Sequence, residues 1–172
     1  HPAGVKANGT VSVSAGSVTV TGTSTATGAR GLSGDSAINV TGGTVSVNLA
    51  GNGATYTNST GVVDSYSAAA FSSDLSISIT GGSVTTTSSG TGGSGLKSNG
   101  TITIGSASGN PTLNITTTGA RFLVSGTDYN HPKTIVATGA ISIINGNTTL
   151  VSTDDGVHSD ASITISGGTN KV

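Results

Sequence analysis

The 172-residue chain contains no cysteine, no methionine and no tryptophan, and only 3 prolines. Without cysteine, the chain has no disulfide, no thiolate metal ligand and no cysteine nucleophile. No apolar run approaches the roughly 18 residues that a membrane-spanning helix needs, so we expect no insertion into a membrane. The lack of oxidisable side chains is typical of a protein that meets oxidants outside the cell. We therefore expect a secreted protein, extracellular or on the cell surface.

Charge is also scarce, with 6 basic and 7 acidic residues, none of them glutamate, and a net charge of -1. This balance provides no field that would attract nucleic acid, so we expect no nucleic-acid partner. What the chain has instead is 27 serines, 30 threonines and 28 glycines, about half of all residues. With 33% hydrophobic residues and few charges, it lacks the composition of a disordered chain. Its length predicts one folded domain over residues 1–172.

A repeat of one unit organises the chain, and its six copies start at Gly4, Gly31, Ala70, Gly95, Thr134 and Gly156. The second, eighth and tenth positions of the unit are apolar in every copy, with Ser, Thr or Asn between them. This period of two predicts strands with one buried face, and no stretch has helical periodicity. Glycine pairs such as Gly42-Gly43 and Gly81-Gly82 separate the two strands of a unit, where a corner favours positive φ.

Short strands that repeat with the same corners predict an all-β fold, a right-handed parallel β-helix (β-solenoid) of about six coils. An antiparallel sandwich would also alternate, but it would not repeat one unit with the same corner residues. In the solenoid, equivalent positions stack at about 4.8 Å per coil, which gives a rod of roughly 29 Å.

The ends of the repeat array carry no polar cap. Val172 is the last apolar position of the sixth unit, and His1-Pro2 echoes His131-Pro132 at the end of a long connection. Uncapped coils are open sheet edges. We therefore expect either a fragment of a longer solenoid or a subunit that associates head to tail with other copies into a filament.

Longer connections on alternate coils, residues 50–69 and 119–133, hold four of the five aromatic residues. One interpretation is that these rings cover the thin core or pack one loop on the next. The other is that they form a platform on one side of the rod for sugar rings, whose hydroxyls polar side chains would bond. The predicted carbohydrate-binding residues are Tyr56, Tyr66, Arg121, Asp128, Tyr129 and His131.

Three carboxylates, Asp154, Asp155 and Asp160, cluster near the end of the chain. Calcium prefers 6–8 oxygen ligands that include carboxylates, so these residues predict one calcium site. The alternative is a solvated turn in which the aspartates bond nearby backbone N–H groups.

The repeat motifs D-G-V-H-S-D at 155–160 and G-L-K-S-N-G-T-I-T-I at 95–104 carry a family resemblance. The chain resembles the secreted bacterial carbohydrate-binding β-helix domains, which are related in fold to pectate lyases. This resemblance covers all six units and implies a right-handed parallel β-helix, extracellular placement, calcium, and binding of acidic polysaccharide without hydrolysis. The acidic residue before the glycine, Asp155 in the last unit, is absent from the other five units.

A catalytic centre is not predicted. A polysaccharide lyase needs a base and a cation held together, and nothing in the sequence fixes Arg30 or Arg121 beside the aspartates. Asp154 and Asp155 are adjacent, so on a strand they would face opposite ways rather than form a hydrolase pair. We expect a non-catalytic protein that binds polysaccharide. The alternative is a structural subunit of a self-assembling extracellular filament.

Overall fold

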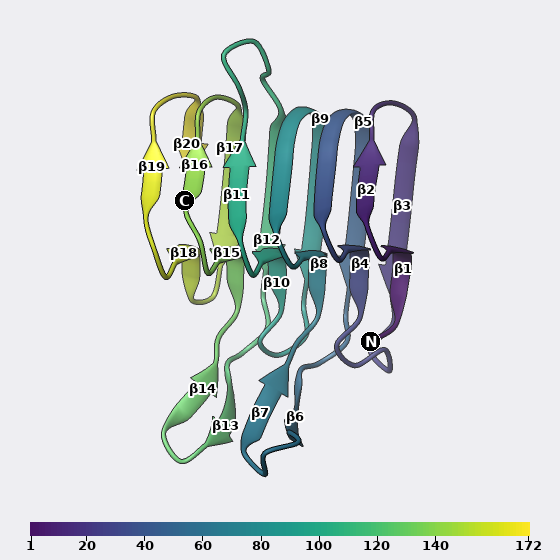
Figure 1. Ribbon diagram of the computed structural model, residues 1–172, viewed down its shortest axis with the longest axis vertical. Coiled ribbons are helices and arrows are strands. Elements are labelled where there is room, and N and C mark those ends of the chain that lie inside the picture. The colour runs from purple at the N-terminus through teal and green to yellow at the C-terminus, as the bar shows by residue number, and fades with distance from the viewer.

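The computed structural model describes all residues, 1–172. It contains twenty β-strands, joined by turns and loops, and no helix. The all-β prediction is therefore confirmed. Accordingly, the structure offers no helix that is long and apolar enough to cross a membrane. Nearly all strands pair in parallel and form the rows of a β-solenoid-like body, with the N-terminal and C-terminal strands at opposite ends (Figure 1).

The first row is a six-stranded parallel sheet to which every repeat contributes one strand. Its strands, in spatial order, are β1 (Ala3–Ala7), β4 (Arg30–Gly34), β8 (Ala69–Ser73), β10 (Ser94–Ser98), β15 (Lys133–Ala137) and β18 (Asp155–Ser159). The pairing register confirms the predicted stacking, because it aligns the second repeat positions Val5, Leu32, Phe71, Leu96, Ile135 and Val157.

The ten-stranded second sheet supplies the two remaining rows. One row contains β2 (Thr10–Val13), β11 (Thr101–Ile104), β16 (Ile141–Ile143) and β19 (Ile163–Ile165), and the other contains β3 (Ser17–Gly22), β12 (Thr112–Thr117), β17 (Asn147–Ser152) and β20 (Thr169–Lys171). The long strands β5 (Ala37–Leu49) and β9 (Ser76–Ser88) run through both rows. They turn between the rows at Gly43 and Gly82, whose φ angles of 77° and 76° confirm the predicted glycine corners.

The core between the rows is narrow. A cluster of 25 buried residues fills it, mainly Val, Ile and Leu from the alternating positions. At the first repeat position the rows come so close that a Cβ on Gly31 would overlap Val47, and one on Gly95 would overlap Ile115. The glycines at these two positions therefore allow the first row to pack closely against the facing strands.

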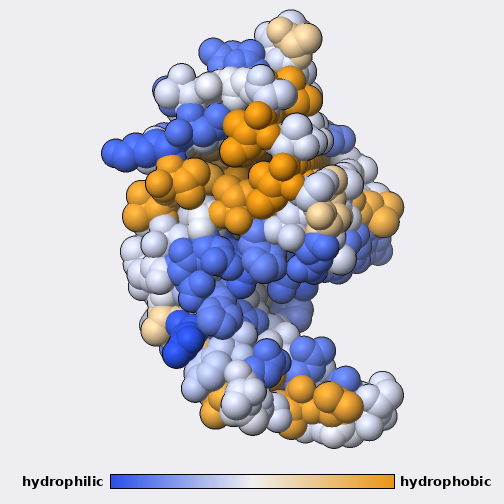
Figure 2. Space-filling model, turned by 90° about the vertical axis from the view of Figure 1, so that its left-hand side faces the viewer, coloured by the Kyte–Doolittle hydropathy of each residue, from blue (hydrophilic) through white to orange (hydrophobic).

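Two antiparallel hairpins occupy the two long connections. The first pairs β6 (Ala54–Thr57) with β7 (Val63–Tyr66), and the second pairs β13 (Phe122–Ser125) with β14 (Asp128–Asn130). Both project from the same side of the body, below the six-stranded sheet (Figure 1). In the view onto the end that carries β19, the lower part of the molecule forms an arm that curves away from the body (Figure 2). The aromatic connections therefore lie on one side of the rod, as predicted, whereas their hairpin structure was not.

Local hydrogen bonds explain why the first connection turns back on itself. The side-chain Oδ1 of Asn58 accepts hydrogen bonds from the backbone N–H groups of Thr60 and Val62, both at 3.0 Å. Gly61 completes the turn with a φ of 82°. An asparagine side chain that mimics a backbone turn in this way is a common initiator of tight loops.

Candidate functional site

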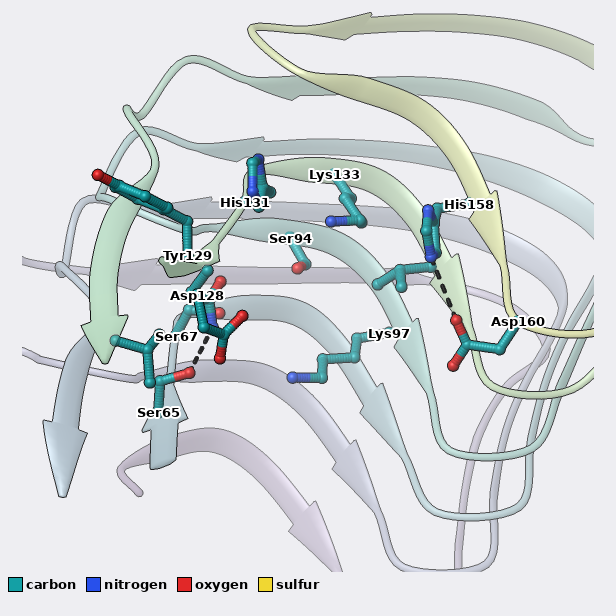
Figure 3. A pocket seen from close by; sticks show the side chains of 13 residues that line it. Ser65, Ser67, Ser94, Lys97, Asp128, Tyr129, His131, Lys133, His158 and Asp160 are labelled. Atoms are coloured by element: carbon teal, nitrogen blue, oxygen red, sulfur yellow. Dashed lines mark hydrogen bonds and ion pairs between the residues drawn. The ribbon is translucent and has the colours of Figure 1, made fainter. Parts of the chain in front are cut away.

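The hairpins overhang the outer face of the six-stranded sheet and form two adjoining pockets. We call the first the β14 pocket; its polar lining includes Ser94, Lys97, Asp128, Tyr129, Asn130, His131, Lys133, His158 and Asp160 (Figure 3). The second, the β7 pocket, is lined by residues that include Arg30, Tyr56, Asp64, Tyr66, Ser72, Asp74 and Asn99. Ser65, Ser67 and Lys97 line both pockets, so together they make one feature, which we call the hairpin groove.

Strand alternation decides which side chains reach the groove. On β10, Leu96 enters the core, and the next residue, Lys97, consequently faces the hairpins. His158 occupies the equivalent position on β18, and it too lines the β14 pocket. The two hairpins are joined to each other by a hydrogen bond from Asn130 Nδ2 to Ser65 Oγ at 3.0 Å, which links β14 to β7.

Lys97 is the central cation of the groove. Its ammonium group makes neither an ion pair nor a hydrogen bond within the protein. Burial lowers the pKa of Lys97, and the positive charges of Arg30 and Lys133 lower it further, while Asp64 opposes them. The floor of the groove therefore presents a positive charge that no protein carboxylate neutralises directly.

The carboxylate of Asp64 is held by the first hairpin. It accepts a hydrogen bond from the Tyr56 hydroxyl at 3.0 Å and another from the Ser65 backbone N–H at 2.7 Å. The hydrogen bond that Tyr56 donates to Asp64 raises the pKa of Tyr56, and the negative charge of Asp64 raises it further, because both disfavour the phenolate. Tyr56 is thus fixed as a neutral hydroxyl at the rim of the β7 pocket.

The aromatic rings divide between the two roles that the sequence left open. Tyr66 packs within the protein, edge-on to His1 with ring centroids 4.7 Å apart, and 6.0 Å from Tyr56. Phe122 is half-buried, and its ring lies directly against Gly53 and Gly92 of other connections. Those two rings hold the connections in place.

Tyr56 and Tyr129, by contrast, remain 44% and 37% exposed and border the two pockets. The guanidinium carbon of Arg121 lies 4.5 Å from the centre of the Tyr129 ring, a cation–π contact that fixes the ring. Two tyrosines are therefore available to contact a ligand.

The structure divides the six predicted carbohydrate-binding residues between the pockets. Tyr56 and Tyr66 line the β7 pocket, and Asp128, Tyr129 and His131 line the β14 pocket. Arg121 lines neither pocket and reaches the groove only through its contact with Tyr129.

The six predicted carbohydrate-binding residues did not include the groove cations Arg30, Lys97 and Lys133. Alternation from the buried Leu96 places Lys97 on the outer face of its strand, but it could not show that the hairpins fold over that face. Arg30 and Lys133 lie two residues before the buried Leu32 and Ile135, so the same rule would have placed them inward.

The predicted calcium ligands Asp154, Asp155 and Asp160 are engaged by basic side chains. His131 Nδ1 lies 2.7 Å from Asp154 Oδ2, and this hydrogen bond lowers the pKa of Asp154. His158 bridges the other two, with Nδ1 3.2 Å from Asp155 and Nε2 3.2 Å from Asp160. No three His, Cys, Asp or Glu side chains are grouped so that they could hold a metal ion. The three aspartates therefore do not fit the oxygen cage that calcium requires.

Comparison with known proteins identifies the family to which the chain belongs. Residues 3–172 match the family described as carbohydrate-binding domain-containing protein. No curated protein and no solved structure matches the chain. The family match covers nearly the whole chain and confirms the resemblance that the repeat motifs carry.

Proposed function

Because the chain belongs to the family of carbohydrate-binding domain-containing proteins, we propose that it binds a polysaccharide in the hairpin groove without catalysing a reaction. The observation that supports this most strongly is the groove itself, where an unpaired Lys97 lies near the exposed Tyr129 ring. A polysaccharide ligand also favours an extracellular location for the protein.

The groove offers the contacts that sugars require. Tyr56 and Tyr129 present aromatic surface to the apolar faces of sugar rings. Asp128 and Asp160 accept hydrogen bonds from sugar hydroxyls, and Lys97 binds an acidic substituent. Apolar contact combined with a few placed polar groups is the usual composition of a small-molecule site.

The proposal of a non-catalytic role is supported by how the groove carboxylates are bonded. Asp64 accepts hydrogen bonds from Tyr56 and Ser65, and Asp160 contacts His158. Glycoside hydrolysis needs one carboxylic acid that donates a proton and a second carboxylate on the other side of the scissile bond. Both oxygens of Asp64 are engaged within the protein, and one oxygen of Asp160 contacts His158, which leaves its other oxygen for a sugar hydroxyl.

Substitution of Tyr129 tests the proposal. We expect Tyr129→Ala to weaken retention on an acidic polysaccharide about fivefold, since an aromatic contact contributes about 1 kcal/mol. Val62→Ala is the matched control, because Val62 is 59% exposed on the other hairpin and lines neither pocket. Affinity electrophoresis measures both variants. Failure of the wild-type protein to bind any polysaccharide on a glycan array would refute the proposed function.

End-to-end association is a second candidate function, favoured by the apolar surface at one end of the rod. A band of hydrophobic side chains crosses this end (Figure 2). Ile163 and Ile165 of β19 are 45% and 53% exposed, whereas Ile102 and Ile104, at the same repeat positions of β11, are fully buried. A further coil, supplied by a second copy, would cover them. Electron microscopy of the purified chain tests this candidate, because single short rods would exclude filaments.

We also infer that the strands wind as six right-handed coils. Each repeat contributes one strand to the six-stranded sheet, and parallel crossover connections are right-handed in about 98% of cases. An experimental structure that showed left-handed connections would overturn this inference.

A further inference from the structure

Lys97 differs in its surroundings from Lys6, Lys133 and Lys171, the other lysines of the chain. Lys6 and Lys133 form ion pairs with aspartates, at 2.9 and 3.8 Å. Lys171 forms none, but it is exposed on β20, the last strand. Lys97 also forms none, and it lies half-buried in the hairpin groove, where it lines both pockets. It is therefore the one lysine that is enclosed and also lacks a carboxylate partner.

A row of cations runs along the rod through Lys97. Arg30 of β4 lies two strands away from it in the six-stranded sheet, and Lys133 of β15 lies on the adjacent strand. Burial lowers the pKa of Lys97 most, the charge of Arg30 lowers it further and Lys133 adds to this effect, while Asp64 opposes them. The other titratable side chains that line the groove are the carboxylates Asp74, Asp128 and Asp160, the histidines His1, His131 and His158, and three tyrosines. At a given pH the neutral amine is therefore more abundant at Lys97 than at an exposed lysine.

Two buried serine hydroxyls line the same pocket as Lys97 (Figure 3). Ser67 and Ser94 are only 7% and 4% exposed, and neither hydroxyl forms a hydrogen bond within the protein. Buried polar groups normally have a partner, which the protein or a water molecule supplies. These two hydroxyls are therefore available to bond the oxygen atoms of a ligand in the pocket.

We propose that Lys97 is a covalent binding site for a neutral hydroxy-aldehyde, with which it forms a reversible imine in the hairpin groove. The nitrogen of the neutral amine attacks the carbonyl carbon, a C–N bond forms, and one nitrogen proton passes to the carbonyl oxygen. The resulting carbinolamine loses this hydroxyl and the second nitrogen proton as water, which leaves a C=N double bond. Water reverses both steps, so the reaction needs no oxidant or reductant.

The surroundings of Lys97 indicate the chemical class of the aldehyde. Its hydroxyl groups would bond Ser67 and Ser94, which have no other partner. It is neutral, because a carboxylate on the ligand would pair with the ammonium form of Lys97 and favour that unreactive form. The open chain of a reducing sugar belongs to this class. This role goes beyond polysaccharide binding, because the reacting group is a free aldehyde, and it does not depend on whether a polymer binds.

Reductive trapping with glyceraldehyde tests the proposal. The full chain is incubated at neutral pH with dilute glyceraldehyde and cyanoborohydride, which converts each imine into a stable secondary amine. Peptide mass spectrometry then measures the modified fraction of each lysine. We expect Lys97 to be modified at least about fivefold faster than Lys171, although Lys171 is the more exposed of the two. Equal or slower modification of Lys97 overturns the proposal.

Two changes of condition separate the chemistry from mere access. The lead of Lys97 should shrink as the pH rises past about 10.4, the ordinary pKa of lysine, because exposed lysines are then neutral as well. A lead that stays constant with pH overturns the proposal, since access alone would explain it. Propanal has the same number of carbons as glyceraldehyde but no hydroxyl, so the lead of Lys97 should be about threefold smaller with it. An equal lead with both aldehydes overturns the ligand class.

A pair of charge-matched variants tests the role of the cation row. Lys6 lies on the same sheet as Arg30 but outside both pockets. We expect Arg30→Gln to slow the modification of Lys97, because it removes a neighbouring positive charge, and Lys6→Gln to leave that rate unchanged. Unchanged modification of Lys171 in both variants shows that they are folded. If Arg30→Gln and Lys6→Gln had the same effect on Lys97, the assignment would be overturned.

Discussion

Thr86 provides a test of the thin core that does not depend on any ligand. Its side chain is 1% exposed, and its hydroxyl oxygen is buried without a hydrogen-bond partner. In the register of the second sheet it lies between Val47 and Ile115, so the stacked positions on both sides are apolar. We expect the valine substitution, Thr86→Val, to stabilise the protein, because it replaces the unpaired hydroxyl by a methyl group of similar size.

The magnitude follows from the cost of a buried polar group without a partner, about 1–3 kcal/mol. Allowing for the imperfect fit of the new methyl group, we expect a gain of about 1–2 kcal/mol. For a chain of this length that corresponds to a rise in Tm of roughly 2–8 °C. Urea unfolding followed by circular dichroism should show a higher midpoint with an unchanged slope, which reports stability rather than a change in the exposed surface.

Thr117 is the matched control for this experiment. It is also fully buried, but its hydroxyl donates a hydrogen bond to Ser152 Oγ at 2.9 Å. Thr117→Val should therefore destabilise the protein by about 1 kcal/mol, opposite in sign to Thr86→Val. If both variants lost stability equally, the reasoning that an unpaired hydroxyl weakens this core would be refuted.

Three further substitutions test the close approach of the rows and the charged groups. Gly95→Ala should lower the unfolding midpoint by several degrees, because the new Cβ would overlap backbone and side-chain atoms, whereas Gly9→Ala, with open space around it, should not. Asp64→Asn should bring the raised pKa of Tyr56 down toward its usual value, seen by absorbance titration of the phenol; an unchanged pKa would contradict the hydrogen bond. The Asp154→Asn variant should be less stable than the wild type at neutral pH, because it loses the carboxylate that pairs with His131. Because the folded-state pKa of this carboxyl is lowered, the difference should vanish as the pH falls through that pKa; pH-dependent urea unfolding measures it.

The body of the fold was predictable because its signals recur. Leu96 and Phe71 are buried as the alternation predicts, and each is supported by five equivalent positions in the other repeats. Gly43 adopts the positive φ that a corner between strands favours. A pattern repeated six times determines both the strand period and the register, since a slip would expose every inward residue at once.

The candidate site was less predictable because its two long connections differ from each other in sequence and lack the six-fold repetition of the strands. The sequence singled out Tyr129 and His131, but it could not show which sheet face the hairpin would cover. Lys97 gained its place in the groove only through that tertiary arrangement. Asp154 was expected to join a calcium site, yet its carboxylate pairs with His131, 23 residues away in the sequence. Local patterns carry no information about such pairings.

The hairpins follow every second strand of the six-stranded sheet, after the second and fourth repeats. Their spacing along the rod is therefore set by the backbone, at about 9.6 Å for two strand separations. A pair of repeats with its hairpin spans 64–66 residues and forms a module that joins its neighbours through the same parallel register. Tandem duplication of this module would lengthen the hairpin groove in fixed steps while leaving the core unchanged. In this architecture the number of modules encoded in one gene would therefore determine the length of the groove.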